Sequence, residues 1–381
     1  MLDVELKSGL FKRSTIQGGI ELIKNLRFEV GPIRPPSEGG SHSLLLRVTR
    51  NCPWSKCRFC YGLPYDRRPF QVRFVDEVKA DIDTVELMVN ELRILSKELG
   101  YGGAITDRLA LDLLSIDPSL GYSPWLSLVF NWAKTGCRTV FIQDADTPIM
   151  KTDRLCEVLR YLRSKFPSIE RVTSYARAKT LFRKSLEELK ELRSAGLTRL
   201  HVGLESGDDE VLNYVNKGVT SQEHVEAGRK VLEAGFELSE YVMPGLGGAD
   251  RWREHAINTA KVLSEINPHY IRVRSLVPRK GTPLYDDYLA GKFKILSPHG
   301  YLKEIRLFVE RLDVDGRISF DHYCNPSYKV ERGFAMPVFD QSHEGYKLPE
   351  DKEELLRIID KALEVEESRF IRPEDLAEAV L

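Results

Sequence analysis

Three cysteines on one short segment are the first residues of this sequence that could do chemistry. Cys52, Cys57 and Cys60 lie within nine residues, in the run NCPWSKCRFC, while the other three cysteines are scattered along the chain. Thiolates at such short spacings are the usual ligands of an iron–sulfur cluster. Three ligands on a four-iron cluster would leave one iron open to a substrate or cofactor. A zinc ion with a distant His or Cys as its fourth ligand is the alternative, and purely structural cysteines are a third.

Several polar or glycine-rich segments could bind a charged small molecule. The segment QDADTP at 143–148 holds two aspartates, which could receive an ammonium group or merely cap a loop or helix. TSYAR at 173–177 suits a ribose or a carboxylate, but would be equally ordinary on a surface loop. GLESG at 203–207 offers an acceptor for hydroxyl groups, and Lys217 is either a cation for an anion or a solvated lysine. The run MPGLGG at 243–248 would allow close backbone approach.

Two pairs of residues in the last third of the chain are further candidates. Arg272 and Arg274 alternate with Val273, so they share one face of a strand, and we expect that face to point inward. His322 and Cys324, in FDHYCN, could supply a hydrogen atom or contact a substrate. The alternative for this second pair is packing or capping. We therefore take His322 and Cys324 as the candidate catalytic residues.

An alternation of short apolar runs and amphipathic stretches predicts the elements that position these residues. We expect strands at 43–49, 139–143, 171–174, 199–203, 237–243 and 270–276. Helices are expected at 75–98, 152–165, 185–195, 208–215, 221–234 and 251–266. Strands that alternate with helices predict βαβ units and parallel pairing. Six such units predict an α/β fold, a partial (β/α)6 TIM-like barrel, whose chemistry lies on the loops after the strands.

The same alternation divides the chain into three parts. Residues 1–40 form a leader that ends in a turn-rich segment, and residues 41–312 form the core barrel, with an insertion at 99–134. Residues 313–381 form a C-terminal extension that we expect to be mostly helical, with helices near 349–366 and 373–380.

Taken in order, the candidate segments resemble those of the radical S-adenosylmethionine (SAM) superfamily, in its methylthiotransferase, elongator-type and oxygen-independent coproporphyrinogen oxidase branches. In that superfamily the cysteine loop follows the first strand, with an aromatic residue before its last cysteine, here Phe59. The spacing here is C-x4-C-x2-C, one residue longer than the usual C-x3-C-x2-C. The stretches GLES at 203–206, VNK at 215–217 and GTPL at 281–284 are similar to stretches of those branches. The resemblance covers roughly residues 40–290.

The resemblance implies two cofactors and a set of residues that hold them. Cys52, Cys57 and Cys60 would hold a [4Fe–4S] cluster, and SAM would bind beside it. Glu205 would meet the ribose hydroxyls or the amino group of SAM, and Lys217 its carboxylate. The residues expected to bind SAM are Phe59, Gln143, Asp144, Asp146, Ser174, Tyr175, Arg177, Glu205, Ser206, Lys217, Met243, Gly245, Arg274 and Leu276.

The activity that the resemblance implies is reductive cleavage of SAM to a 5′-deoxyadenosyl radical, which abstracts hydrogen from a substrate. That substrate would be a small molecule, a lipid or a tetrapyrrole, and the enzyme would be an oxidoreductase, a mutase or a transferase. The electron donor would be flavodoxin-like or ferredoxin-like. The alternatives are a non-catalytic protein that carries haem or a cluster on the same scaffold, and a zinc-binding protein.

The amino-acid composition limits the kinds of partner that we expect for this protein. Lys and Arg total 56 against 57 Asp and Glu, so the formal net charge of -1 gives no support to a general nucleic-acid or membrane-surface partner. No apolar run approaches the roughly 18 residues of a membrane span, and the first residues lack the apolar core of a secretory signal. The clustered cysteines do not fit a disulfide scaffold. We expect a cytoplasmic protein with no nucleic-acid partner and no membrane span.

Overall fold

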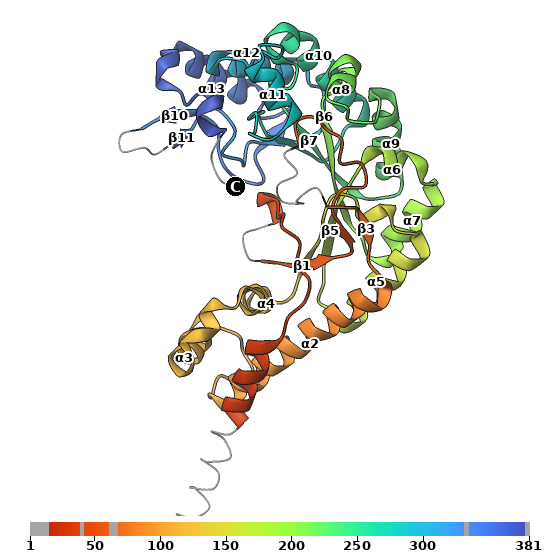
Figure 1. The fold of residues 1–381 in the computed structure, drawn as a ribbon, viewed down its shortest axis with the longest axis vertical. Helices are drawn as coiled ribbons and strands as arrows, with labels where there is room; N and C mark the ends of the chain where they lie inside the picture. Colours follow the sequence, from red (N-terminus) through yellow and green to blue (C-terminus); the bar gives the residue numbers. More distant parts are fainter. Residues whose placement is uncertain (1–14, 39–41, 61–67, 331–334, 378–381) are drawn as a thin grey trace, which may run out of the picture.

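A curved sheet forms the centre of the molecule, and helices line its outer side (Figure 1). The computed structural model describes residues 15–38, 42–60, 68–330 and 335–377. The sheet has eight strands, which lie side by side in chain order. They are β1 (Ser43–Arg47), β4 (Thr139–Gln143), β5 (Arg171–Ala176), β6 (Arg199–Glu205), β7 (Glu237–Val242), β8 (Tyr270–Val273), β9 (Gly316–Ser319) and β12 (Tyr346–Leu348).

All neighbouring strands from β1 to β9 are parallel, and only β12 runs antiparallel, beside β9. Each crossover between parallel strands needs a connection on one side of the sheet, and right-handed crossovers in chain order place every connection on the same side. The connecting helices are α2 (Val75–Glu98), α5 (Thr152–Lys165), α6 (Ala178–Arg183), α7 (Leu186–Ala195), α8 (Asp209–Tyr214), α9 (Ser221–Glu233), α10 (Gly248–Ile266), α11 (Pro283–Leu289) and α12 (Pro298–Arg311). The predicted α/β class with a partial, open barrel is confirmed.

Local signals explain where individual helices begin and end. Ser185 Oγ accepts from the backbone N–H of Glu188 at 3.1 Å, and the Glu188 carboxylate accepts from that of Ser185 at 2.9 Å. This reciprocal cap starts α7 by satisfying backbone donors that the helix leaves unpaired. Gly196, with φ of 116°, follows the last turn in a left-handed conformation that favours glycine.

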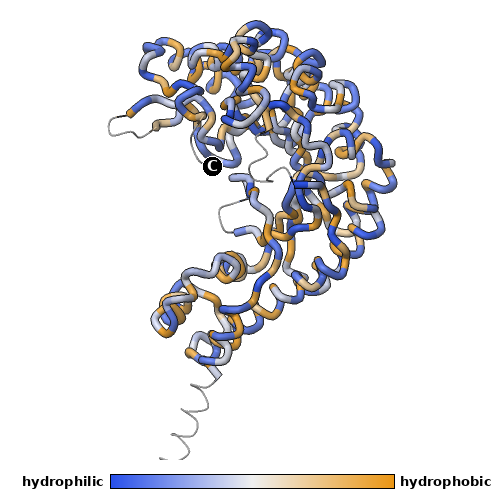
Figure 2. The backbone as a smooth tube through the Cα atoms, viewed as in Figure 1, coloured by the Kyte–Doolittle hydropathy of each residue, from blue (hydrophilic) through white to orange (hydrophobic). Residues whose placement is uncertain are grey.

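The main core lies between the sheet and the helices. Apolar residues run along the central strands and recur on the helix turns that face them (Figure 2). Cys137 and Cys156 belong to this core, as a structural role for them would require. None of the helices in the described parts of the chain combines the length and apolar character needed to cross a membrane.

The insertion protects one edge of the sheet. It contains α3 (Asp107–Ile116), η3 (Pro118–Tyr122) and α4 (Pro124–Lys134), and α4 packs against β1 and α2. Trp132 Nε1 donates to the carbonyl of Thr139 at 2.7 Å, and Trp125 Nε1 donates to that of Phe28, also at 2.7 Å. Covering an edge strand removes a template for pairing with other chains.

The C-terminal extension is more strand-rich than its predicted helical character. Its helices are α13 (Lys352–Glu364), η6 (Glu367–Arg369) and η7 (Pro373–Leu376), whereas β9 and β12 extend the central sheet. Two small two-stranded sheets pair β10 (Ser327–Lys329) with β11 (Ala335–Pro337), and β2 (Thr49–Arg50) with β3 (Gln71–Val72). Residues 378–380, part of an expected helix, lie outside the described residues.

The leader closes the bottom of the inner side, where the strands begin. Residues 15–25 are helical and η1 (Pro36–Glu38) follows, while residues 1–14 and 39–40 of the leader lie outside the described residues. The buried Glu38 carboxylate contacts Arg171 Nη2 at 3.2 Å, His201 Nε2 at 3.2 Å and Arg199 Nη1 at 3.7 Å. Burial raises the pKa of Glu38, but the His201 hydrogen bond and the neighbouring positive charges outweigh it and lower that pKa to about 2. We call Glu38 and these three partners the floor cluster.

Candidate functional site

The cysteine loop follows β1 and β2 and is fixed to two distant parts of the chain. The backbone N–H of Arg58 donates to Val215 at 2.9 Å, and its carbonyl accepts from Leu284 at 3.0 Å. Trp54 Nε1 donates to the carbonyl of Asn216 at 2.7 Å. None of the three cysteines forms a disulfide. The loop therefore has a defined place beside the segments after β6 and β8.

A small apolar cluster supports this loop from below. Phe59 packs against a buried group formed by residues from α8, α11 and the loops after β7 and β8. Met243 and Leu276, both expected near SAM, belong to the same cluster. Phe59 is thus a packing residue whose ring also carries the Lys217 ammonium 5.7 Å from its centroid.

Asp144 and Gln143 organise the surroundings of the cysteine loop. Asp144 Oδ2 accepts from Arg47 Nε at 2.8 Å, from Arg47 Nη2 at 2.6 Å and from the backbone N–H of Asn51 at 2.7 Å. Gln143 accepts from Gly31 N at 2.7 Å and donates to the carbonyls of Gly31 and Ile33 in the leader. Burial raises the pKa of Asp144, although Arg47 opposes this rise. The structure places both side chains as supports of the loop and the leader.

Asp146 fixes the end of the next strand. Its carboxylate accepts from the backbone N–H of Arg177 at 3.1 Å and from the Thr180 hydroxyl at 2.6 Å. Burial raises the pKa of Asp146 to about 6, against the lowering effect of these two hydrogen bonds. The segment expected to receive an ammonium group is therefore already bonded to protein groups.

Glu205 and Lys217 form an ion pair next to the cysteines. Lys217 Nζ lies 3.1 Å from Glu205 Oε1, and both side chains are largely buried. Burial lowers the pKa of Lys217, but Glu205 and Cys57 raise it by more than burial lowers it. The pKa therefore lies above its ordinary value, and the ammonium stays charged. Glu205 has φ of 63° at an irregularity in β6, which turns its side chain out of the regular strand pattern. The charges of this pair complement those of the amino-acid end of SAM. An ammonium group can meet its carboxylate, and a carboxylate can meet its amino group.

Arg177 joins this pair to the cysteine loop. Its guanidinium donates to the carbonyl of Lys217 at 2.9 Å and lies 5.3 Å from the centroid of the Trp54 ring. No local sequence pattern signals a role for Trp54, which contacts both Asn216 and Arg177, or for Arg47. Only the tertiary arrangement reveals their role.

The pKa of the Cys57 thiol indicates whether the cysteine loop suits an iron–sulfur cluster. Burial raises the pKa of Cys57 to about 11, with Lys217 lowering it and the other two cysteines raising it. A thiol of this kind stays protonated unless a metal centre supplies positive charge. Three grouped thiols and a buried neighbouring cation that can meet an anionic ligand fit an iron–sulfur cluster with an open position.

A single zinc ion fits less well. Three ligands of one zinc ion lie within roughly 4 Å of each other, whereas a four-iron cube holds its thiolates further apart. Among the described residues, Cys52, Cys57 and Cys60 included, no three His, Cys, Asp or Glu side chains are grouped as ligands of one metal ion would be.

The remaining expected SAM residues spread along the inner side of the sheet. Tyr175 bonds to Arg274, and the Arg274 guanidinium lies 4.4 Å from the centroid of the Tyr241 ring. Gly245, with φ of 90°, donates its N–H to Glu304 Oε2 at 2.9 Å. Ser174 and Ser206 are buried and bond to nearby backbone groups. Glu205, Lys217 and Arg177 thus lie near the cysteines. Tyr175 and Arg274 lie farther from the cysteines along the inner side of the sheet.

His322 and Cys324 lie on the Arg274 side of this surface. Burial, together with the charges of Arg274 and Arg279, lowers the pKa of His322 to about 3. Burial raises the pKa of Cys324, with the Tyr323 hydrogen bond and the two arginines opposing the rise. At neutral pH this corner therefore holds a neutral imidazole and a protonated thiol.

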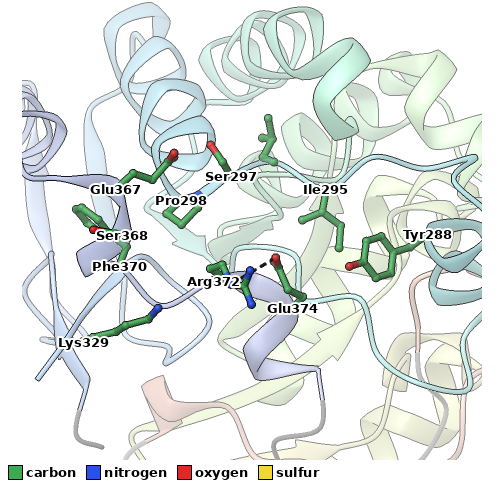
Figure 3. Close-up of a pocket in the computed structure, with 11 residues that line it drawn as sticks. Tyr288, Ile295, Ser297, Pro298, Lys329, Glu367, Ser368, Phe370, Arg372 and Glu374 are labelled. Atoms are coloured by element: carbon green, nitrogen blue, oxygen red, sulfur yellow. Dashed lines mark ion pairs between the residues drawn. The ribbon is translucent and has the colours of Figure 1, made fainter. Parts of the chain in front are cut away.

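A separate cavity of about 410 Å³ lies between the extension and the loop before α12 (Figure 3). Most of its charged side chains already have partners: Arg372 pairs with Glu374 and Asp375, and Glu367 accepts from the backbone N–H of His299. A cavity of about 20 Å³ next to it shares Pro298 and includes Cys324 and Tyr323 in its wall.

One segment of the chain matches a known family. Residues 127–260, about a third of the chain, match the family model of the radical SAM superfamily. This segment is similar to the radical SAM superfamily. The matched segment runs from α4 into α10, so it contains Glu205, Lys217 and the loops after β4 to β7. The cysteine loop precedes it.

Curated relatives match this chain over short segments. The tRNA uridine(34) acetyltransferase of Methanocaldococcus jannaschii is 24% identical over 114 residues, 28% of this chain and 20% of that protein. Elongator complex protein 3 of Mus musculus is 21% identical over 201 residues, 52% of this chain and 34% of that protein. The chain therefore spans about a fifth to a third of the length of these relatives.

Solved structures were compared in the same way. Coproporphyrinogen III oxidase from Escherichia coli has a TM-score of 0.45 and 16% identity, covering 77% of this chain and 55% of that one. Methylornithine synthase has a TM-score of 0.42 and 13% identity, covering 91% and 75%.

Proposed function

We propose that this chain is a radical SAM enzyme, with Cys52, Cys57 and Cys60 as the ligands of a [4Fe–4S] cluster. When bound, the cluster and SAM supply an electron and a 5′-deoxyadenosyl radical for hydrogen abstraction. The observation that carries the proposal is the largely buried Glu205–Lys217 pair, at 3.1 Å, next to the partly buried Cys57 thiol. A carboxylate and an ammonium side by side suit the zwitterionic end of an amino acid.

The roles of the side chains follow from their contacts. Lys217 meets the SAM carboxylate, and Glu205 meets its amino group or the ribose hydroxyls. The apolar cluster around Phe59 excludes water from the cysteine loop, which strengthens the charged contacts above it. Gly245 has no room for a side chain, because a Cβ at 245 would collide with Tyr301. His322 and Cys324 face the substrate.

Anaerobic reconstitution with iron and sulfide, followed by dithionite and SAM, tests this proposal. We expect about four irons per chain, the visible absorbance of an iron–sulfur cluster, and formation of 5′-deoxyadenosine. Dithionite replaces the flavodoxin-like or ferredoxin-like donor. Cys57→Ala should lose all three signals, whereas Cys156→Ala, which changes a buried cysteine of α5, should keep them.

Other outcomes separate the alternatives. Stoichiometric zinc without iron would support the zinc-binding protein and contradict the proposal. Haem binding without SAM cleavage would support a trafficking protein.

A further inference from the structure

Arg274 is a partly buried cation without an ion pair to any described carboxylate. It stands just after β8 and is held by Tyr175 and by the face of the Tyr241 ring. Its Nε is buried and has no hydrogen-bond partner, while the charges of Asp321 and Glu205 act on it from a distance. The buried arginines nearby differ in their ion pairs: Arg272 pairs with Asp321, and Arg73 pairs with Asp81 at 2.6 Å.

The carboxylates nearest to Arg274 are already occupied. Asp321 lies 3.7 Å from Arg272 Nη1 and 2.9 Å from His343 Nδ1. Glu205 pairs with Lys217. Each of these two carboxylates therefore has another cation as its ion-pair partner, although the charges of both act on Arg274. A partly buried guanidinium that has no ion pair of its own can form one with an anionic ligand.

Arg274 and Lys217 have mostly different neighbours, although the charge of Glu205 acts on both. The charge of Lys217 lowers the pKa of Cys57, and its ammonium lies over the Phe59 ring. Arg274 belongs to the surroundings of His322 and Cys324. A SAM molecule bound to the cluster would have its carboxylate at the cysteine loop, because its amino and carboxyl groups would reach the open iron. Arg274 is then left for a second anionic group.

We propose that Arg274 binds an anionic group of the substrate, a carboxylate or a phosphate, and holds it beside His322 and Cys324. This rests on the proposed function and adds the chemical class of its substrate. The neutral His322 fits this role as a hydrogen-bond donor or acceptor that adds no competing charge. The thiol of Cys324 lies within the same group of side chains.

Thermal unfolding of the whole chain in matched buffers tests the proposal. The probes are inorganic phosphate and acetate, each compared with chloride at equal ionic strength. We expect one of them to raise the Tm of the wild-type protein by about 2 °C or more. A response to phosphate alone would identify a phosphate-bearing substrate, and a response to acetate alone a carboxylate.

Variants show whether the response belongs to Arg274. Arg274→Met should be destabilised less than Arg272→Met in chloride, because it breaks no ion pair, and it should not respond to the anion. Arg274→Lys should keep part of the response. Arg272→Met, which breaks an existing pair, should lose stability, and Lys329→Met, at an exposed lysine, should respond like wild type. An Arg274→Met protein that is as unstable as Arg272→Met, or that does not fold, would make Arg274 a structural residue and overturn the proposal, as would the absence of any anion response.

The two proposals fail in different ways. Cys57→Ala, which removes a ligand of the proposed cluster, should retain the response to the anion. A wild-type protein that responds to the anion but never cleaves SAM would contradict only the proposed function. Loss of SAM binding in Arg274→Met, measured by equilibrium dialysis, would assign the guanidinium to SAM and overturn only this inference.

Discussion

At the scale of single residues, the site is built from charges that are buried beside aromatic rings. Lys217 keeps its proton because Glu205 and Cys57 outweigh the cost of its burial. The Phe59 ring below it and Arg177 beside it restrict where that ammonium can move. A cation held in this way needs little rearrangement to meet a carboxylate, which is the advantage of a preorganised site.

Replacing Lys217 by Gln should weaken SAM binding by about 10- to 100-fold, because it removes a charged hydrogen bond in a buried site. Equilibrium dialysis with labelled SAM on cluster-loaded protein measures this change. Lys217→Arg should retain part of the affinity, and Lys329→Gln should retain all of it. An unchanged dissociation constant in Lys217→Gln would remove Lys217 from the SAM site.

Gly218 offers a test of the contact between the cysteine loop and the segment after α8. A Cβ at Gly218 would lie 2.6 Å from the Trp54 ring, whereas a Cβ at Gly235 would meet nothing within 4 Å. Both glycines have positive φ, so each change to Ala should cost about 1 kcal/mol of stability from backbone strain. Only Gly218→Ala should also reduce the iron content after reconstitution, because it displaces Trp54. Equal iron in the two variants would contradict the role given to this contact.

At the scale of elements, the leader and the strands depend on each other through the floor cluster. The η1 turn brings Glu38 to the first residues of β5 and β6, where Arg171 and Arg199 would otherwise lie without this counter-charge. Arg199 has a second partner in Glu237, at 2.7 Å, so the charges form a network. A buried network of this kind is costly to break at one member.

Glu38→Gln should lower the free energy of unfolding at neutral pH by about 3 kcal/mol, because it leaves buried positive charge uncompensated. The sign of the pH dependence follows from the lowered pKa. An unfolded Glu38 titrates near 4.5 and the folded one near 2, so its contribution is complete above pH 4.5 and is lost as the pH falls toward 2. Urea unfolding between pH 2 and 7 should therefore show a shallower acid loss in the variant. Parallel curves would contradict the low pKa of Glu38.

The sequence predicted the elements better than their contacts. The α2, β4 and α5 bounds follow from apolar periodicity and local caps, which are properties of neighbouring residues. Nothing near Glu38 signals that it meets residues of β5 and β6, and nothing near Asp144 signals that Arg47 and Asn51 N–H occupy it. The same holds for β9 and β12. Their short runs become strands because β8 offers an edge to β9, and β9 in turn offers an edge to β12. Tertiary pairing sets these features, and a local pattern does not contain it.

At the scale of the whole molecule, the sheet continues across the predicted boundary at residue 313. β9 pairs with β8 and β12 pairs with β9, while α12 packs on α13. Phe370 is fully buried and lies against Tyr328 and His299. The extension is therefore tied to the core by hydrogen bonds and by packing, and we propose that the two unfold together.

Phe370→Ala should test this cooperativity, because it removes a large buried side chain at a cost of about 3–5 kcal/mol. The four tryptophans all precede residue 313, so their fluorescence reports the core, whereas circular dichroism reports the whole chain. We expect both signals to shift together to lower urea. A separate early transition seen by circular dichroism alone would show that the extension unfolds by itself.

The contact between Trp54 and Asn216 also sets an order of events during synthesis. These residues are 162 positions apart, and Glu38 and His201 are 163 positions apart. A ribosome that adds roughly 5–20 residues per second needs on the order of 10 to 30 s to make that stretch. During this time the three thiols belong to a nascent chain that lacks the segments on which their loop docks. Iron and sulfide would therefore find a formed site only after the ribosome has passed residue 217, and the growing chain exposes its thiols to oxygen until then.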